Sequence, residues 1–211
     1  MRPIICSAAL FALAWPAAGQ DRAEERRDLP AFDEIEIQGG LDLRVSQGEP
    51  QSVVISGRAD YVPDVETSVE DGRLIIDMEG RRRWNNADIH VTITLPNLSL
   101  LEVNGAIDGD LTGLDVADLK IIVNGAGDID ADGRCNTLSV ELNGAADIDA
   151  EELRCAEVAV QINGAGNATV FAAERIDAEV NGVGNIDVMG NPGQVSTSKS
   201  LLSNITIHKT R

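Results

Sequence analysis

Aspartates recur at fixed positions in the second half of the sequence, within a phrase whose clearest copy reads NGAGDID. Counted from the Asn that opens each copy, one set lies four residues on and a second set lies six residues on. The first set is Asp108, Asp128 and Asp147, and the second is Asp110, Asp130, Asp149 and Asp187. Ile129, Ile148 and Ile186 separate the two sets, so a strand would turn both sets of carboxylates to its outer face.

Stacked carboxylates of this kind are candidate ligands for a cation. Two unit charges about 5 Å apart repel by roughly 3 kcal/mol at a surface dielectric, before screening by salt. Ca²⁺ prefers oxygen ligands, and the phrase partly resembles a calcium-binding nonapeptide repeat, although its period is about twice as long. The calcium candidates are Asp108, Asp110, Asp128, Asp130, Asp147 and Asp149. A solvated acidic face is the simpler interpretation, and the sequence indicates no other cofactor.

Enzymatic chemistry finds little support in the other residues. His90 and His208 are the only histidines, and neither has the spacing of a metal site or a catalytic triad. No Gly-rich loop precedes a helix, which argues against a nucleotide site. Some parallel β-helices cleave acidic polysaccharides, but an acidic surface would repel such a substrate. We therefore expect a protein that is not an enzyme.

Charge and composition exclude one class of binding partner and define the type of core. The chain has 211 residues, a formal net charge of -18 and a pI near 4.3. Such a surface repels nucleic acid, and the one basic run, Arg81 to Arg83, is typical of a solvated loop. Aromatic residues make up only 3% of the chain, so the core must consist of aliphatic side chains.

The N-terminus has the pattern of a secretory signal. Arg2 precedes an apolar stretch from Ile4 to Pro16, and small residues follow at positions 17–19. The stretch is too short to span a membrane, and the mature chain shows no transmembrane segment. We predict a signal peptide over residues 1–19 and export to the periplasm, the outer surface or the medium. Residues 20–30 are polar and predict a flexible leader.

Strand patterns fill the mature chain. Residues 31–100 show period-two alternation, as in Ile89, Val91, Ile93 and Leu95, and predict an N-terminal β region of the same domain. From residue 101 to 211 the chain repeats. Asn-Gly begins at Asn104, Asn124, Asn143, Asn163 and Asn181, in steps of 20, 19, 20 and 18 residues. Aliphatic residues keep fixed positions relative to each Asn, so every unit carries two short strands with one apolar face each.

Two architectures fit this period. One is a parallel β-helix with one coil per repeat, and the other is an antiparallel meander in which Asn-Gly forms every second hairpin. Cys135 and Cys155 each lie eight residues before the next Asn. In a β-helix they stack about 4.8 Å apart, within disulfide reach, whereas a meander separates them by roughly 9.6 Å. We favour an all-β, right-handed parallel β-helix, a solenoid with coils of about 20 residues and the N-terminal strands packed on one end.

The Asn column has a structural interpretation in this architecture. Stacked Asn side chains hydrogen-bond from coil to coil, as amide ladders do in cross-β structure, and Asn tolerates the left-handed conformation that a corner needs. The alternative is a polar groove for a ligand. The last copy is degenerate, because Lys199-Ser200 takes the place of Asn-Gly, and its polar residues predict a cap on the open end of the stack.

The order and spacing of these segments resemble a known bacterial family. LPAFDEIEIQGGLDLRVSQGE, VETSVEDGRLIID, DIHVTITLPNLSLLEVNGA and the repeated NGAGDID look like the head GIN domain, whose members carry the label of auto-transporter adhesin. The resemblance covers about residues 29–208 and implies an exported β-solenoid. It brings no catalytic residue to this chain.

Three classes of function remain open at this point. The first is an exported, non-catalytic envelope or surface module that interacts with a protein or glycan, in the manner of an adhesin. The second is a structural envelope protein with no discrete ligand, and the third is a polysaccharide-active β-helix enzyme. The sequence does not identify the partner or the oligomeric state.

Overall fold

The computed structural model describes residues 22–78 and 88–208. Within these ranges it holds thirteen strands in one sheet and one short 3₁₀ helix, η1 (Val62–Asp64). None of the helical structure in this part of the chain is long and apolar enough to cross a membrane. The predicted signal peptide and the basic run Arg81 to Arg83 lie outside the described residues.

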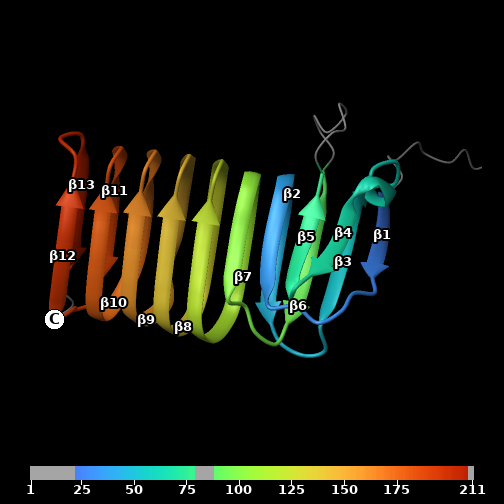
Figure 1. Ribbon diagram of the computed structural model, residues 1–211, viewed down its shortest axis with the longest axis horizontal. Coiled ribbons are helices and arrows are strands. Elements are labelled where there is room, and N and C mark those ends of the chain that lie inside the picture. Colours follow the sequence, from blue (N-terminus) through green and yellow to red (C-terminus); the bar gives the residue numbers. More distant parts are fainter. Residues whose placement is uncertain (1–21, 79–87, 209–211) are drawn as a thin grey trace, which may run out of the picture.

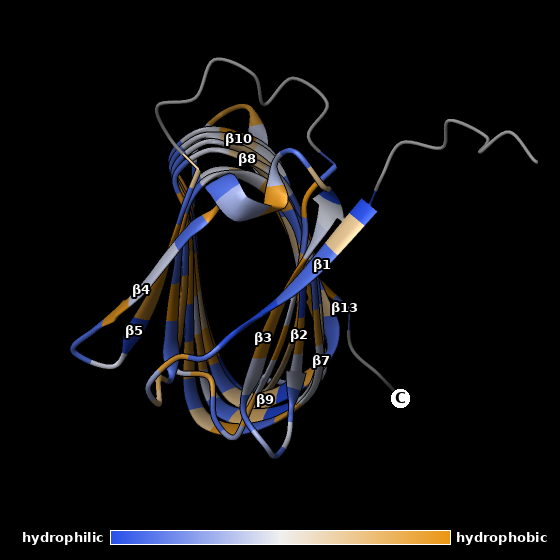
Figure 2. Ribbon diagram, turned by 90° about the vertical axis from the view of Figure 1, so that its right-hand side faces the viewer, coloured by the Kyte–Doolittle hydropathy of each residue, from blue (hydrophilic) through white to orange (hydrophobic). Residues whose placement is uncertain are grey.

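The repeats form stacked parallel coils. Strands β7 (Leu100–Val123), β8 (Ala126–Leu142), β9 (Ala145–Ile162) and β10 (Ala165–Val180) each bend around a corner and pair in parallel with the next. Figure 1 shows them side by side along the long axis, and Figure 2 looks down the stack, where the coils superimpose as an elongated ring. The predicted all-β solenoid is therefore confirmed, and the antiparallel meander is wrong for this region.

Each coil contributes to two opposite walls. The aspartate wall is formed by residues 106–111, 126–131, 145–150, 165–170, 183–189 and 203–208. The second wall is formed by residues 118–123, 137–142, 157–162, 175–180 and 194–199. Asn-Gly forms the corner that leads from the second wall to the aspartate wall.

The stack begins well before the sequence repeat does. Strand β2 (Glu34–Gln47) is itself a coil, because it pairs in parallel with β7 along both walls. Gln38 lies beside Asn104 and Asp42 lies beside Asp108 in this register. Strands β5 (Arg73–Asp77) and β6 (His90–Leu95) then extend the two walls on the other side of β2.

Antiparallel strands cover the N-terminal end. Strand β4 (Glu66–Glu70) pairs with β5, and β3 (Ser52–Arg58) pairs with β6. Strand β1 (Arg22–Arg27) pairs with β3, so this part of the predicted leader is an ordered edge strand. Ala23 packs against the core and the Arg27 guanidinium donates to the Val62 and Val65 carbonyls, which explains why this polar segment is held.

The C-terminal end is the open end of the stack. It consists of β11 (Val183–Met189), β12 (Gln194–Lys199) and β13 (Ser203–His208). Lys199 lies in register with buried Val180 but is itself exposed, so this edge strand carries a charge, which is a known way to discourage edge-to-edge pairing. The amide of Ser200 donates to the Val180 carbonyl, as that of Asn181 does to Ile162, so Ser200-Leu201 replaces Asn-Gly, one residue later than expected.

The core is a set of aliphatic columns. Leu119, Leu138, Val158 and Ile176 stack from coil to coil and are each at most 2% exposed. No polar or charged residue is buried among the described residues. Full burial of each Val, Leu or Ile contributes about 1.5–3 kcal/mol, so the columns supply the main driving force for stacking.

The Gly of Asn-Gly is required by close packing. A Cβ on Gly144 would overlap the carbonyl oxygen of Gly125, and the same holds for Gly125 against Gly105. These glycines have no left-handed φ, and neither do the Asn residues before them, so the expected left-handed corner is wrong. The corner needs Gly because consecutive backbones leave no room for a side chain.

Candidate functional site

Strand register brings the aspartates into two adjacent columns on the aspartate wall. From β6 to β13, the first column reads His90, Asp42, Asp108, Asp128, Asp147, Asn167, Asn185 and Asn204. The second reads Thr92, Arg44, Asp110, Asp130, Asp149, Thr169, Asp187 and Thr206. Acidic residues therefore occupy both columns on the central coils, and neutral side chains predominate toward the C-terminal end.

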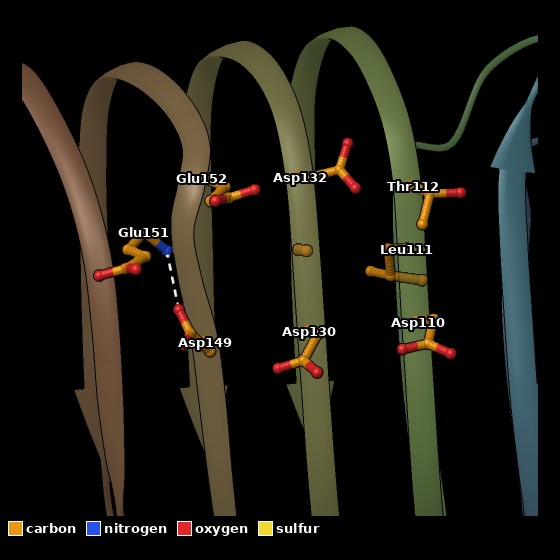
Figure 3. Close-up of a pocket in the computed structure, with 9 residues that line it drawn as sticks. Asp110, Leu111, Thr112, Asp130, Asp132, Asp149, Glu151 and Glu152 are labelled. Atoms are coloured by element: carbon orange, nitrogen blue, oxygen red, sulfur yellow. Dashed lines mark hydrogen bonds between the residues drawn. The ribbon is translucent and has the colours of Figure 1, made fainter.

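Part of this face is hollowed. An open hollow of about 320 Å³ lies where the aspartate wall meets the corner, and we call it the acidic hollow. Figure 3 shows its carboxylates on three neighbouring strands: Asp110, Asp130, Asp132, Asp149, Glu151 and Glu152. No basic side chain is among the described residues that line it.

The local field in the hollow is strongly negative. Partial loss of hydration raises the pKa of Asp130, and the nearby charges of Asp149 and Asp110 raise it further. Two carboxylates of the hollow also accept backbone hydrogen bonds: Asp132 from the Gly113 amide at 2.7 Å and Asp149 from the Glu151 amide at 3.1 Å. Asp110 pairs with Arg44 at 3.4 Å, and no basic side chain is among the lining residues beside the other carboxylates.

The six calcium candidates divide into two groups. Asp110, Asp130 and Asp149 line the acidic hollow, whereas Asp108, Asp128 and Asp147 lie in the neighbouring column. Asp147 accepts two hydrogen bonds from Asn167, each 2.8 Å long, so this carboxylate takes part in a side-chain ladder.

Sequence reasoning missed Asp132, Glu151 and Glu152. They lie in the corner segments, where the register shifts between neighbouring coils, so no fixed spacing from the Asn identifies them. The sequence shows that these residues are acidic, but it does not show that they lie in the same hollow as Asp110, Asp130 and Asp149.

The Asn column forms a continuous ladder of side-chain amides. Each Nδ2 donates to the Oδ1 of the preceding coil at 2.8–3.1 Å, through Asn104, Asn124, Asn143, Asn163 and Asn181. A second ladder, unexpected as such, runs from Asn185 to Asn167 and on to Asp147. The Asn side chains already bond one another, which agrees with a role in holding the coils together.

The two cysteines meet on consecutive coils. Cys135 and Cys155 are register partners with Cα atoms 4.5 Å apart, and a disulfide joins them. Both side chains are buried at the corner, on the side of the coil away from the Asn ladder.

The two histidines contact carboxylates that the sequence did not associate with them. The ring nitrogens of His90 lie 2.9 Å from Asp42 and 2.9 Å from Asp88, and His208 lies 2.8 Å from Asp187. Asp42 and His90 are far apart in the sequence, and only the pairing of β2 with β6 brings them together.

Comparison with known proteins agrees with this architecture. Residues 31–192 match the family model described as "Putative auto-transporter adhesin, head GIN domain". A crystal structure of a "putative adhesin" from Bacteroides fragilis aligns with a TM-score of 0.70 and 24% identity, covering 90% of this chain and 98% of that one. A "putative lipid binding protein" from Parabacteroides distasonis aligns with a TM-score of 0.46 and 18% identity, covering 90% and 97% of the two chains. No curated protein matches the chain.

The first of these structures shows the same fold over nearly the whole of both chains. The family model begins just before β2 and ends between β11 and β12, so it includes every aspartate of the two columns and the Asn ladder. The chain therefore belongs to the head GIN domain family.

Proposed function

We propose that this protein is an exported, non-catalytic, adhesin-like module that binds a positively charged protein or glycan partner on its aspartate wall. The observation that carries the proposal is the acidic hollow, where three consecutive coils present carboxylates with no basic residue among the described lining residues. The family description supports a role at the surface. Export rests on the signal-like pattern of residues 1–19.

The geometry of the wall suits a multivalent ligand. Neighbouring strands lie about 4.8 Å apart, so each column offers carboxylates at a regular spacing along the stack. A surface of one charge attracts an oppositely charged partner and raises its rate of association, and the effect weakens with salt. The second wall is mixed, because Lys120 approaches Glu141 at 4.0 Å and neutral Ser139 and Gln161 lie beside them.

A catalytic role would need more than carboxylates. Parallel β-helices that cleave polysaccharides combine Asp with Arg and Lys. The described lining of the acidic hollow holds no Arg or Lys, and Arg44 contacts the hollow through its ion pair with Asp110 at 3.4 Å. Partial loss of hydration and the neighbouring carboxylate charges raise the pKa of Asp130, and the same charges would repel an acidic polysaccharide. These features favour binding over catalysis.

The proposal is tested with a pair of variants of equal charge. The variant D110N/D130N/D149N removes three carboxylates from the acidic hollow, and E157Q/D177N/E179Q removes three from the second wall. Labelled mature protein is titrated onto native cells and envelope fractions at low and physiological salt. We expect saturable, salt-sensitive binding that falls at least about tenfold in the first variant and persists in the second.

The other outcomes are equally informative. An equal loss in both variants would show a general effect of net charge and would contradict a specific face. An absence of saturable binding in the wild-type protein would favour a structural envelope role. The calcium hypothesis is tested on the same proteins, because a melting temperature unchanged by millimolar calcium would rule it out.

A further inference from the structure

A second cluster lies on the aspartate wall where β6 joins β2, and the small hollow beside it shares Asp110 with the acidic hollow. His90 is placed between two carboxylates, with Nδ1 2.9 Å from Asp42 Oδ2 and Nε2 2.9 Å from Asp88 Oδ1. Ligand atoms of these three residues all lie within 4.8 Å of one another, and no other group of this kind is found among the described residues. We propose that His90 and Asp42, together with Asp108, bind a divalent transition metal of the zinc class, and that Asp88 orients the imidazole.

A small hollow lies on the Nδ1 side of the imidazole. Its volume is about 60 Å³, and Asp42, His90, Asp108 and Asp110 are among the residues that line it. Asp42 and Asp108 are register partners on adjacent strands, so their carboxylates flank the same space. The hollow opens to solvent, which leaves room for water or for a ligand atom of a partner to complete the coordination.

The charges around the hollow leave a place for a divalent cation. Arg22 pairs with Asp88 at 2.8 Å, and Arg44 pairs with Asp110 at 3.4 Å. Asp42 and Asp108 are left without an arginine partner among the described contacts, and they are the carboxylates nearest to Nδ1 in the strand register. A divalent cation would balance the two negative charges that remain.

The imidazole of His90 favours a transition metal over calcium or magnesium. Carboxylates alone suit calcium or magnesium, whereas an imidazole nitrogen combined with carboxylate oxygens suits zinc, nickel or copper. Two ligands about 2.0–2.1 Å from a tetrahedral zinc lie roughly 3.3 Å apart, so the present 2.9 Å between Nδ1 and Asp42 needs to widen by only a few tenths of an ångström.

Asp88 acts as a positioning residue in this arrangement. A histidine that binds a metal through one ring nitrogen usually donates the other N–H to a carboxylate, which holds the ring and sets its tautomer. Asp88 lies at hydrogen-bond distance from Nε2, and Arg22 holds Asp88 in turn. The orienting contacts therefore exist without the metal.

The test uses untagged mature protein and two metals. Cobalt(II) is titrated by visible absorption, which reports an imidazole-containing tetrahedral site, and zinc is titrated by calorimetry. We expect one equivalent to bind. Affinity should fall at least about tenfold in His90→Ala and in Asp108→Asn, by analogy with the loss caused by removing an orienting partner. Circular dichroism checks that each variant remains folded.

His208→Ala is the matched control, because His208 lies on the same wall and contacts one carboxylate, Asp187, at 2.8 Å. This variant should bind cobalt and zinc as the wild type does. The proposal is overturned if the wild-type protein shows no stoichiometric binding, if His90→Ala binds as tightly as wild type, or if His208→Ala loses affinity equally. The result is independent of the cell-binding experiment, because the acidic hollow is intact in all these variants.

Discussion

Cys135 on β8 and Cys155 on β9 are partners in adjacent parallel strands, with Cα atoms 4.5 Å apart and a disulfide between them. This relationship is possible only if one repeat makes one coil. In an antiparallel meander the same two positions would be roughly 9.6 Å apart, which is beyond the reach of a disulfide. This single disulfide therefore distinguishes the parallel β-helix from the antiparallel meander.

The first prediction concerns this bond. The cysteines are separated by 20 positions, and a disulfide that closes a loop of this size stabilises a protein by about 3 kcal/mol in the chain-entropy model. Protein refolded under reducing conditions should unfold at lower urea concentration than oxidised protein. The double variant C135A/C155A should not respond to reductant, and mass spectrometry of non-reduced peptides should detect the linked pair.

The second prediction concerns the corner glycines. Gly144→Ala places a Cβ against the Gly125 carbonyl, so we expect a loss of at least about 2 kcal/mol in urea unfolding, or failure to fold. Gly193→Ala is the control, because its nearest neighbour would be the Glu174 carbonyl oxygen at 3.9 Å and its φ is ordinary. Equal stability of the two variants would contradict the close approach of the coils.

The third prediction concerns the Asn ladder. Asn143 donates to Asn124 at 2.9 Å and accepts from Asn163 at 2.8 Å, so its loss breaks the row in the middle. Asn143→Ala should lower the free energy of unfolding by about 1–3 kcal/mol. Asn181→Ala, which removes a single bond to Asn163 at 3.1 Å, should cost less. A larger loss of unfolding free energy in Asn181→Ala than in Asn143→Ala would contradict a stabilising role for the unbroken Asn ladder.

The fourth prediction concerns the pH dependence of stability, to which Asp130 and Asp115 contribute in opposite directions. The folded protein raises the pKa of Asp130 through partial loss of hydration and the neighbouring charges, so folding is favoured at low pH and this contribution is lost as pH rises through the raised pKa. Near neutral pH the ionised Asp130 carboxylate destabilises the folded protein, so Asp130→Asn should raise the free energy of unfolding there. High salt should shrink the difference, because it screens the repulsion.

Asp115 provides the opposite case. The Arg134 guanidinium donates to both Asp115 oxygens, at 2.8 Å and 2.6 Å, and holds the pKa of this carboxyl below its ordinary value. Stability from this pair is present above the ordinary pKa and is lost as pH falls through the lowered one. Urea unfolding from pH 2.5 to 7 should show that Asp115→Asn loses stability at the upper end of the range, where Asp130→Asn gains it.

The fifth prediction concerns the open end of the stack. Deletion of residues 195–211 removes most of β12 and all of β13, which exposes the edges of β10 and β11. Such edges pair with other chains, so the truncated protein should form oligomers or aggregates in size-exclusion chromatography. A soluble monomer would contradict a capping role for the last coil. Lys199→Val in the full chain should promote association more mildly, because it removes a charge from the exposed edge strand.

Strand content, the parallel coils and the apolar columns were predictable from the sequence, because a repeat of about 20 residues with alternating apolar positions forces each coil to bury one face against the next. The same periodicity placed Asp110, Asp130 and Asp149 on one outer face. Handedness stays a prediction from the general preference of parallel crossovers.

Tertiary structure alone decided the contacts that cross non-repeating segments. β2 joins the stack, so Asp42 continues the aspartate column and meets His90, although neither lies in a recognisable repeat. Asp132 and Glu151 enter the acidic hollow through corners whose length varies. The sequence by itself determined which residues share a face of a coil, because side-chain alternation is local. Only the folded chain determined which coils, corners and ends lie side by side, because strand pairing between distant segments depends on register and packing that no local pattern encodes.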